Sequence, residues 1–312
     1  MIKHIFGPVP SRRLGISLGV DIIPFKTCTL DCIYCECGGT TNLTAARSSF
    51  VDAGTIIEEL KPFLAQHQTL EYITFSGSGE PTLNKDLKDI IAAIKKITLV
   101  PVAVLTNGTL LYLPEVRESL LQADLILPSL DAVSPPVFAR INQPHQDLEI
   151  GAVIEGMVKF REQYKGDIRL EVFIVSGIND GSAELKKLYE AIKKIKPDRV
   201  QLNSLDRPPA YDHVEPLDTG RLEKIAAGWQ DLPARVEVIK RAGKRREIAS
   251  FSRNLENNIL NTIDRRPLTI EDLEELTGKK RIELYKYIDI LEREKKVIAK
   301  IVKDKIFYAP TS

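Results

Sequence analysis

The chain has 312 residues, 43% of them hydrophobic and 28% charged, so it can bury one large core or one core with a small appended domain, which excludes disordered and collagen-like classes. With 44 basic and 43 acidic residues, its net charge of +1 creates no overall field towards nucleic acid or an anionic membrane, so an anionic partner must meet a local patch. The absence of a long apolar run predicts a soluble, cytoplasmic protein that is not bound to a membrane.

Strand-like and helix-like segments alternate over the first two thirds of the chain. Strands are predicted at residues 15–23, 72–76, 100–106, 125–129, 168–175 and 199–205, where Val, Ile and Leu dominate. Helices are predicted between them, at residues 52–66, 87–96, 115–122, 149–163 and 182–194. Repeated strand–helix units favour a parallel sheet with right-handed crossovers. Six such units predict an α/β fold, a partial (β/α)6 TIM-like barrel with its chemistry on loops at the carboxyl ends of the strands.

The pattern changes after the last of these strands. A helix at residues 218–229 and an apolar, basic stretch at 236–253 are expected to close the barrel domain, which spans residues 1–253. Residues 254–312 form a second predicted domain, with helices at 255–264, 270–277 and 281–294 and strands at 297–302 and 306–309. This order resembles a winged-helix domain. Its third helix mixes acidic and basic residues, which favours docking or substrate positioning over DNA binding.

All four cysteines lie between positions 28 and 37, and clustered cysteines in a reducing cell are typical of metal ligands. Cys28, Cys32 and Cys35 form a CxxxCxxC pattern directly after the first predicted strand. Three thiolates so close together can hold a 4Fe-4S cluster by three of its irons and leave the fourth iron without a protein ligand. Cys37 is predicted to be a non-ligand, and the alternative is a closed zinc or electron-transfer site with Cys37 as the fourth ligand.

With Tyr34 just before the third cysteine, this pattern resembles the signature of the radical S-adenosylmethionine (SAM) superfamily. The resemblance implies a radical enzyme with two cofactors, the 4Fe-4S cluster and SAM, in which the amino and carboxylate groups of SAM chelate the open iron. It implies reductive cleavage of SAM to a 5′-deoxyadenosyl radical that abstracts hydrogen from a substrate. A low-potential electron donor such as flavodoxin or ferredoxin is also implied.

The same resemblance places the SAM contacts at the ends of later strands. Residues 78–81 are similar to the family's GGEP motif with serine replacing one glycine, in a turn whose backbone is expected to bond the ammonium group of SAM. An ordinary strand-to-helix turn is the alternative. The residues assigned to this turn are Ser76, Gly77, Ser78, Gly79 and Glu80.

Further SAM contacts are assigned to the ends of four other strands. Asn107 is assigned to the ribose or carboxylate of SAM, Ser129 and Asp131 to ribose hydroxyls with a helix cap as the alternative, Gly177 and Asn179 to a loop over the adenine, and the Leu202 backbone to the adenine.

The substrate is the open question. Residues 7–15, 21–28 and 140–145 resemble radical SAM proteins related to the wyosine-forming tRNA enzymes, although no cysteines for a second cluster precede Cys28. The resemblance and the basic run at residues 240–246 favour a tRNA base, with a solvated surface as the other interpretation of the run. The alternatives are a protein substrate, as in glycyl-radical activation, and a redox-sensing iron–sulfur winged-helix regulator.

Four further residues are candidates for substrate contact. Arg12 and Arg13 either lie in a solvated loop or hold a substrate phosphate or carboxylate at the barrel mouth. Tyr211 and His213 lie in the loop after the last predicted strand of the barrel.

Overall fold

The computed structural model describes residues 4–66, 70–207, 209–211, 214–239, 255–279, 281–302 and 304–311. The basic run at residues 240–246 and His213 therefore lie outside the described residues. Among the residues that are described, no helix is long and apolar enough to cross a membrane.

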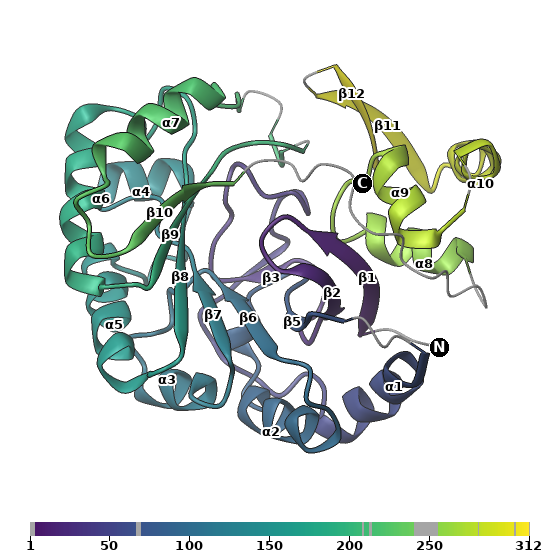
Figure 1. Ribbon diagram of the computed structural model, residues 1–312, viewed down its shortest axis with the longest axis horizontal. Coiled ribbons are helices and arrows are strands. Elements are labelled where there is room, and N and C mark those ends of the chain that lie inside the picture. Colours follow the sequence, from purple (N-terminus) through teal and green to yellow (C-terminus); the bar gives the residue numbers. More distant parts are fainter. Residues whose placement is uncertain are drawn as a thin grey trace.

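One eight-stranded sheet forms the barrel, in the order β1-β2-β5-β6-β7-β8-β9-β10 (Figure 1). Neighbouring strands from β2 to β10 are parallel, and β1 is antiparallel to β2. The strands are β1 (Ile5–Ser11), β2 (Gly15–Val20), β5 (Tyr72–Phe75), β6 (Val102–Thr106), β7 (Leu125–Pro128), β8 (Asp167–Phe173), β9 (Arg199–Asn203) and β10 (Arg235–Val238). Two short strands, β3 (Thr27–Cys28) and β4 (Asn42–Leu43), pair in the segment that carries the cysteines. The predicted α/β partial barrel is confirmed.

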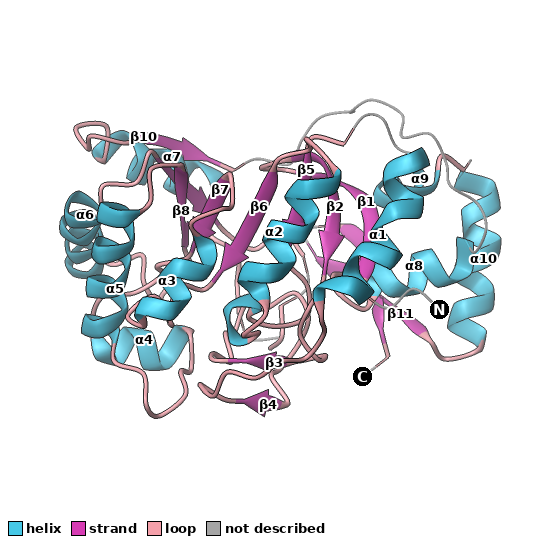
Figure 2. Cartoon of the chain, turned by 90° about the horizontal axis from the view of Figure 1, so that it is seen from below, coloured by secondary structure: helices cyan, strands magenta, loops and turns pink. Residues whose placement is uncertain are grey.

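Helices cover the outer face of this sheet (Figures 1 and 2). They are α1 (Ala53–Gln66), α2 (Leu87–Ile97), α3 (Pro114–Leu120), α4 (Pro135–Ile141), α5 (Ile150–Gln163), α6 (Ser182–Ile195) and α7 (Thr219–Gly228). Helix α2 shows why they form, because its buried residues Leu87, Ile90, Ile91 and Ile94 recur at helical spacing. Each such side chain contributes about 1.5–3 kcal/mol by leaving water. The sheet and the inner faces of the helices thus enclose the apolar core.

The inside of the barrel is polar along β8 to β10, whereas along β5 to β7 it is apolar, with Ala103, Leu125 and Leu127 in a cluster separate from the core under the helices. Strand β8 buries Ile168, Leu170 and Val172, while the alternate residue Glu171 accepts a hydrogen bond from Asn203 at 2.9 Å. Elsewhere in the sheet, the side chains of Gln201 in β9 and Glu237 in β10 are joined at 2.8 Å. The polar side of the interior suits a substrate that carries hydrogen-bonding groups.

Strand β1 and helix α4 were not predicted from the sequence. Strand β1 contains two prolines and its register with β2 shifts between Phe6 and Val9. Proline is tolerated there because β1 is an edge strand, whose outer backbone groups need no partner strand. Helix α4 has only seven residues and begins with two prolines, which suit the first turn of a helix.

The C-terminal unit has three helices followed by a hairpin, in the predicted order. They are α8 (Leu255–Ile263), α9 (Ile270–Thr277), α10 (Arg281–Arg293), β11 (Val297–Val302) and β12 (Lys305–Pro310). The unit lies beside β1, and Val9 belongs to its hydrophobic core (Figure 1). Its identity as a winged helix, and the domain boundary at residue 254, stay predictions.

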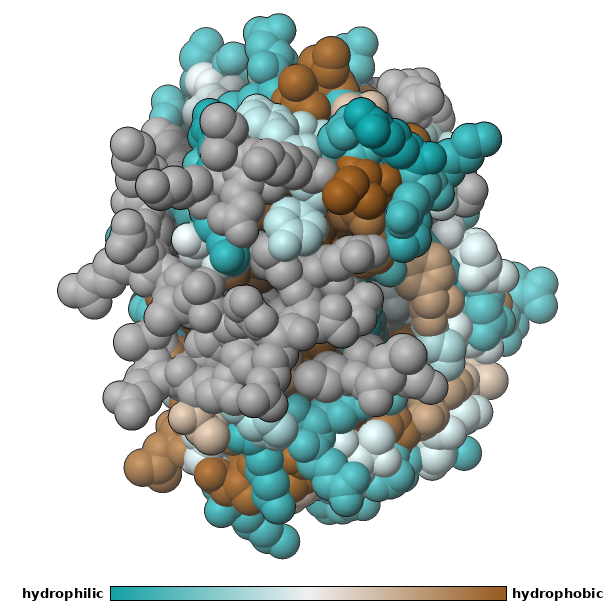
Figure 3. All heavy atoms as spheres, turned by 90° about the vertical axis from the view of Figure 1, so that its right-hand side faces the viewer, coloured by the Kyte–Doolittle hydropathy of each residue, from teal (hydrophilic) through white to brown (hydrophobic). Residues whose placement is uncertain are grey.

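The surface on the side of the C-terminal unit is mixed. Figure 3 shows hydrophobic areas separated by hydrophilic ones among the atoms it colours. Two of the exposed apolar side chains in this unit, Ile301 and Ile306, lie opposite each other in the hairpin. Such a surface is compatible with the expected docking role.

Candidate active site

The segment that carries the four cysteines, residues 28–37, is called the cysteine loop, and it follows β2 at the carboxyl end of the barrel. Cys28 ends β3, and all four cysteines are free and partly buried. Each of the three predicted ligands has one nitrogen donor near its sulfur. The pairs are Asn107 Nδ2 with Cys28 Sγ at 3.6 Å, Asn142 Nδ2 with Cys32 Sγ at 3.3 Å, and Lys26 Nζ with Cys35 Sγ at 3.6 Å. Donors placed at sulfur stabilise the negative charge of a thiolate, so the three sulfurs fit the ligand set of an iron–sulfur cluster.

The three thiols differ in how readily they ionise. Burial raises the pKa of Cys28 to about 12 and raises the pKa of Cys32 well above its usual value. A hydrogen bond from Cys37, together with the charge of Lys26, lowers the pKa of Cys35 to about 6. A bound metal deprotonates a coordinating thiol outright, so iron ligation is compatible with both kinds of environment.

The thiols do not converge on one point. Within the described part of the chain, no three His, Cys, Asp or Glu side chains are placed to hold a single metal ion. In a cubic cluster each cysteine binds a different iron, so convergence on one atom is not required. Sγ of Cys37 also lies 2.7 Å from the carbonyl oxygen of Arg265 and 3.5 Å from that of Gly77, which are alternative acceptors for its single thiol hydrogen. That Cys37 is a non-ligand stays a prediction.

The Gly-rich turn after β5 packs against the chain that leads into Cys28. A Cβ atom at Gly79 would lie 2.0 Å from the carbonyl oxygen of Thr27, and one at Gly77 would lie 2.3 Å from Cγ of Asp21. The two segments therefore approach as closely as they do only because both positions are glycine. The Ser78 hydroxyl donates to Asp21 Oδ2 at 2.9 Å. The serine that replaces a glycine of the GGEP motif thus anchors the turn.

Glu80 joins the Gly-rich turn to the end of β6. It is buried, which raises its pKa, and its carboxylate accepts hydrogen bonds from the Thr106 hydroxyl at 2.6 Å and the Asn107 backbone at 2.7 Å. The side chain of Asn107 in turn donates to the Thr29 hydroxyl at 2.7 Å. Glu80 therefore positions Asn107 against the cysteine loop.

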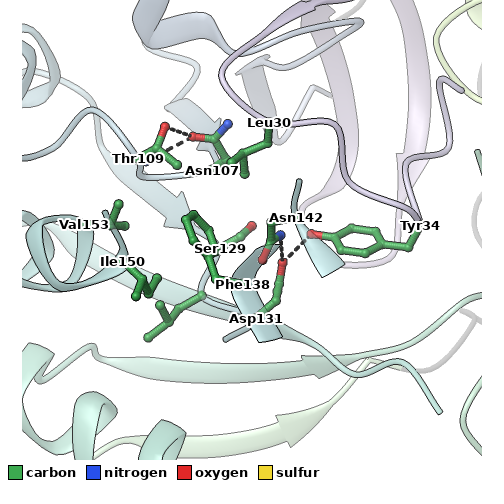
Figure 4. A pocket seen from close by; sticks show the side chains of 11 residues that line it. Leu30, Tyr34, Asn107, Thr109, Ser129, Asp131, Phe138, Asn142, Ile150 and Val153 are labelled. Atoms are coloured by element: carbon green, nitrogen blue, oxygen red, sulfur yellow. Dashed lines mark hydrogen bonds between the residues drawn. The ribbon is translucent and has the colours of Figure 1, made fainter. Parts of the chain in front are cut away.

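Asp131 is the centre of a buried hydrogen-bond network (Figure 4). Its Oδ2 accepts from the Tyr34 hydroxyl at 2.5 Å and from Asn142 Nδ2 at 2.8 Å, and its Oδ1 accepts from the Phe173 backbone at 2.9 Å. Burial raises the pKa of Asp131 to about 6. The Tyr34 ring stacks on Phe173 with centroids 3.9 Å apart. Both carboxylate oxygens are therefore engaged by protein donors, and Asp131 caps no helix.

A small pocket lies at this network, between the cysteine loop and the ends of β6 and β7 (Figure 4). It is lined by Leu30, Tyr34, Asn107, Thr109, Ser129, Leu130, Asp131, Phe138, Asn142, Ile150 and Val153. Three of the predicted SAM contacts, Asn107, Ser129 and Asp131, are thus brought together. The Ser129 hydroxyl also lies 3.4 Å from Glu171 Oε2.

The two residues assigned to the loop after β8 have different surroundings. Asn179 is fully buried and its side chain donates to the carbonyls of Asp131 and Phe173, at 2.8 and 2.7 Å. Gly177 is exposed and has φ +70°, a conformation that favours glycine. Asn179 therefore supports the backbone around Asp131, while Gly177 is accessible.

Leu202 lies inside the sheet. Its side chain is fully buried, and its carbonyl accepts a hydrogen bond at 2.9 Å from Ile239, just after β10. That bond uses one of the two lone pairs of the carbonyl oxygen, so the adenine contact of the Leu202 backbone stays a prediction.

A wider cleft of about 470 Å³ opens next to the cysteine loop. Its walls come from that loop, the end of α4, the segment after β8 and the segment before α7. They include Ile33, Ala139, Arg140, Gln143, Val175, Ser176, Ile178, Val214 and Glu215. The cleft offers space for a ligand beside the small pocket.

Three site residues were not predicted from the sequence. Asp21 and Lys26 belong to the approach to Cys28, and Asn142 belongs to residues 140–145, so each lay in a segment that the sequence had singled out. No spacing rule connects Asn142 to Cys32, however, because the fold alone brings them together. Tyr211 donates its hydroxyl to Asp31 Oδ2 in the cysteine loop at 2.9 Å, and its contact with substrate stays a prediction.

Comparison with known proteins adds family relationships to this geometry. Residues 22–192 match the family model described as the radical SAM superfamily. The UPF0026 protein MJ1312 of Methanocaldococcus jannaschii is 33% identical over 306 residues, which are 97% of this chain and 94% of that protein. A protein of Brachyspira hyodysenteriae named GTPase Obg is 41% identical over 268 residues, but this chain covers only 39% of its length.

Among solved structures, a radical SAM methyltransferase from Sphaerobacter thermophilus has a similar fold. The TM-score is 0.57 at 17% identity, over 71% of this chain and 65% of that one.

Proposed function

Because the chain belongs to the radical SAM superfamily, and to the UPF0026 proteins within it, it is a radical SAM enzyme, and we propose that Cys28, Cys32 and Cys35 hold its 4Fe-4S cluster. The observation that supports this proposal best is that each of these three sulfurs has its own nitrogen donor within 3.6 Å. Donors of this kind are among the features by which proteins tune iron–sulfur clusters.

The cofactors define the reaction class. When bound, the cluster and SAM supply a 5′-deoxyadenosyl radical, formed together with methionine by one electron from a low-potential carrier such as flavodoxin or ferredoxin, to take a hydrogen atom from the substrate. The chain's own residues bind and orient SAM. The backbone of residues 76–79 would meet its ammonium group, and the side chains of Asn107 and Ser129 would meet its carboxylate or ribose. Asp131 and Asn179 hold this pocket in shape through their hydrogen bonds.

The Gly-rich turn provides a direct test of the SAM site. Gly79→Ala would force Cβ into the Thr27 carbonyl, so the turn must move away from the cysteine loop. Overpacking of this kind costs about 1–3 kcal/mol, which corresponds to a loss of about fivefold to 150-fold in SAM affinity, measured by equilibrium dialysis with labelled SAM. Gly151→Ala is the matched control, because a Cβ at Gly151 meets nothing within 4 Å. Unchanged SAM affinity in Gly79→Ala would exclude this turn from the site.

We propose a tRNA base as the substrate, with a protein residue as the second candidate. The support is the sequence resemblance to the wyosine-related proteins and the basic run at residues 240–246. Reversing Lys244, Arg245 and Arg246 to Glu should weaken tRNA binding and flatten its salt dependence, because fewer counterions are released. Filter binding at several salt concentrations measures both. If the wild-type protein shows no salt-dependent affinity for tRNA, the tRNA proposal fails.

A further inference from the structure

Three guanidinium groups meet beside the cysteine loop. Arg12 comes from the turn between β1 and β2, Arg207 follows β9, and Arg266 lies between α8 and α9. Glu36, the residue between Cys35 and Cys37, sits among them, with its carboxylate 4.0 Å from Arg12 Nη2 and 3.5 Å from Arg207 Nε. Burial, and then the like charges of Arg207 and Arg12, lower the pKa of Arg266 to about 10. Three guanidinium groups therefore share one region next to the proposed cluster.

Glu36 is held loosely among Arg12, Arg207 and Arg266, which together are called the cradle below. Charge-assisted hydrogen bonds between a guanidinium and a carboxylate are about 2.7–2.9 Å long, and both contacts of Glu36 are longer. Nε of Arg266 is buried and has no hydrogen-bond partner among the described residues. The side chain of Glu36 is 31% exposed, so it can turn towards solvent. An incoming anion could thus take its place and complete the bonds that Glu36 leaves unmade.

Two other carboxylates contact the same arginines. Asp272 lies 3.0 Å from Arg207 Nη1 and also accepts from the backbone of Thr269 in the capping box of α9, so it is fixed by the C-terminal unit. Asp206 lies 3.6 Å from Arg12 Nη1. The formal charges of three arginines and three carboxylates balance, so an anion can enter only by displacing one carboxylate. Glu36 is the one on the cysteine loop with loose contacts to two of the arginines.

The cradle also faces the barrel interior. Arg12 Nη1 donates to Asn203 Oδ1, at the end of β9, at 3.4 Å. A ligand in the cradle would therefore lie between the cysteine loop and the polar side of the barrel interior at β8 and β9. A substrate has to be near this loop if a radical formed there is to reach it.

We propose that Arg12, Arg207 and Arg266 bind an anionic group of the substrate, a phosphate or a carboxylate, and that Glu36 fills this site as an internal competitor until the substrate arrives. The inference rests on the proposed function, because it specifies the substrate class of that site. It gives Arg12 the anion-binding role considered from the sequence, whereas Arg13 is paired with Glu171 at 2.6 Å.

Isothermal titration calorimetry tests the proposal on the anaerobic, cluster-reconstituted full chain without SAM. Inorganic phosphate and acetate serve as probes, at constant ionic strength set with chloride. We expect Arg266→Gln to lower the affinity for the bound probe about tenfold or more, because charge-assisted hydrogen bonds are lost. Arg293→Gln removes the same charge from a side chain that is 77% exposed on α10 and should leave the affinity unchanged.

Glu36→Gln is a second variant, for which a gain in affinity is expected. Misfolding would lower the affinity, so it cannot produce this result. The substitution removes the charge of the internal competitor, so the affinity should rise, on the order of tenfold. Preference for phosphate identifies a phosphorylated substrate such as RNA, and preference for acetate identifies a carboxylate.

Three results would overturn the proposed anion-binding site. They are no binding of either probe, equal losses in Arg266→Gln and Arg293→Gln, or weaker binding in Glu36→Gln. SAM is absent from this titration, so SAM cleavage by the wild-type protein decides the proposed function separately.

Discussion

Replacing Cys28, Cys32 or Cys35 with alanine is expected to abolish the visible absorbance of the iron–sulfur cluster and the cleavage of SAM. A cubic cluster held by three cysteines has no spare protein ligand, so the loss of any one thiolate leaves a second iron uncoordinated. Iron and sulfide content after anaerobic reconstitution, together with 5′-deoxyadenosine formation, measure the effect.

Cys37→Ala is the matched control, because it removes a thiol from the same loop. Cys37 is predicted not to be a cluster ligand, so its loss should leave both the cluster and SAM cleavage intact. Loss of the cluster in Cys37→Ala would show a closed four-cysteine site and contradict the open iron.

Asp131→Ala should lower the free energy of unfolding by about 3 kcal/mol or more. The substitution leaves three buried donors, from Tyr34, Asn142 and Phe173, without their acceptor, and each unsatisfied donor costs about 1–3 kcal/mol. Because Asn142 also donates to Cys32, the cluster should be lost faster in air. Urea denaturation of the reconstituted protein measures the first effect, and decay of the visible absorbance measures the second.

Asp147→Ala is the control for Asp131→Ala. Its side chain is 68% exposed, so the expected change in stability is within about 0.5 kcal/mol. Asp131→Asn keeps one acceptor oxygen, so its free energy of unfolding should lie between those of Asp131→Ala and Asp147→Ala. If Asp131→Ala and Asp147→Ala unfold at the same urea concentration, the network around Asp131 does not stabilise the site.

The barrel was predictable where strands are buried on both sides. Runs of Val, Ile and Leu marked β2 and β5 to β9, because parallel strands under helices need apolar side chains. Strand β1 was not predicted, since its prolines are usual in loops and are tolerated here only at a sheet edge.

The candidate site likewise has parts that were predictable from the sequence and parts that were not. The cysteine loop and the Gly-rich turn are each a short continuous segment, so the spacing of the cysteines and the resemblance to the family's GGEP motif were enough to single them out. Asn142, and the cradle of Arg12, Arg207 and Arg266, unite segments that are far apart in the chain, and no periodicity links such segments. Asp131 lines a pocket together with Asn107 and Ser129, but a sequence does not show whether a carboxylate meets a ligand or protein donors.

The position of the C-terminal unit was also beyond the sequence. Its helices and hairpin follow from local patterns, but its attachment depends on contacts such as Arg265 Nε with Asp21 Oδ2 at 3.0 Å. Asp21 also holds Ser78, so the C-terminal unit is joined through one carboxylate to the Gly-rich turn.

The most direct test of the central claim is the formation of 5′-deoxyadenosine by the reduced, reconstituted wild-type protein incubated with SAM under strictly anaerobic conditions. We expect slow formation of 5′-deoxyadenosine and methionine in equal amounts even without substrate, quantified by liquid chromatography and mass spectrometry. Tightly bound zinc in place of iron, with no 5′-deoxyadenosine formed, would contradict the assignment of the cysteine loop to a SAM-cleaving cluster.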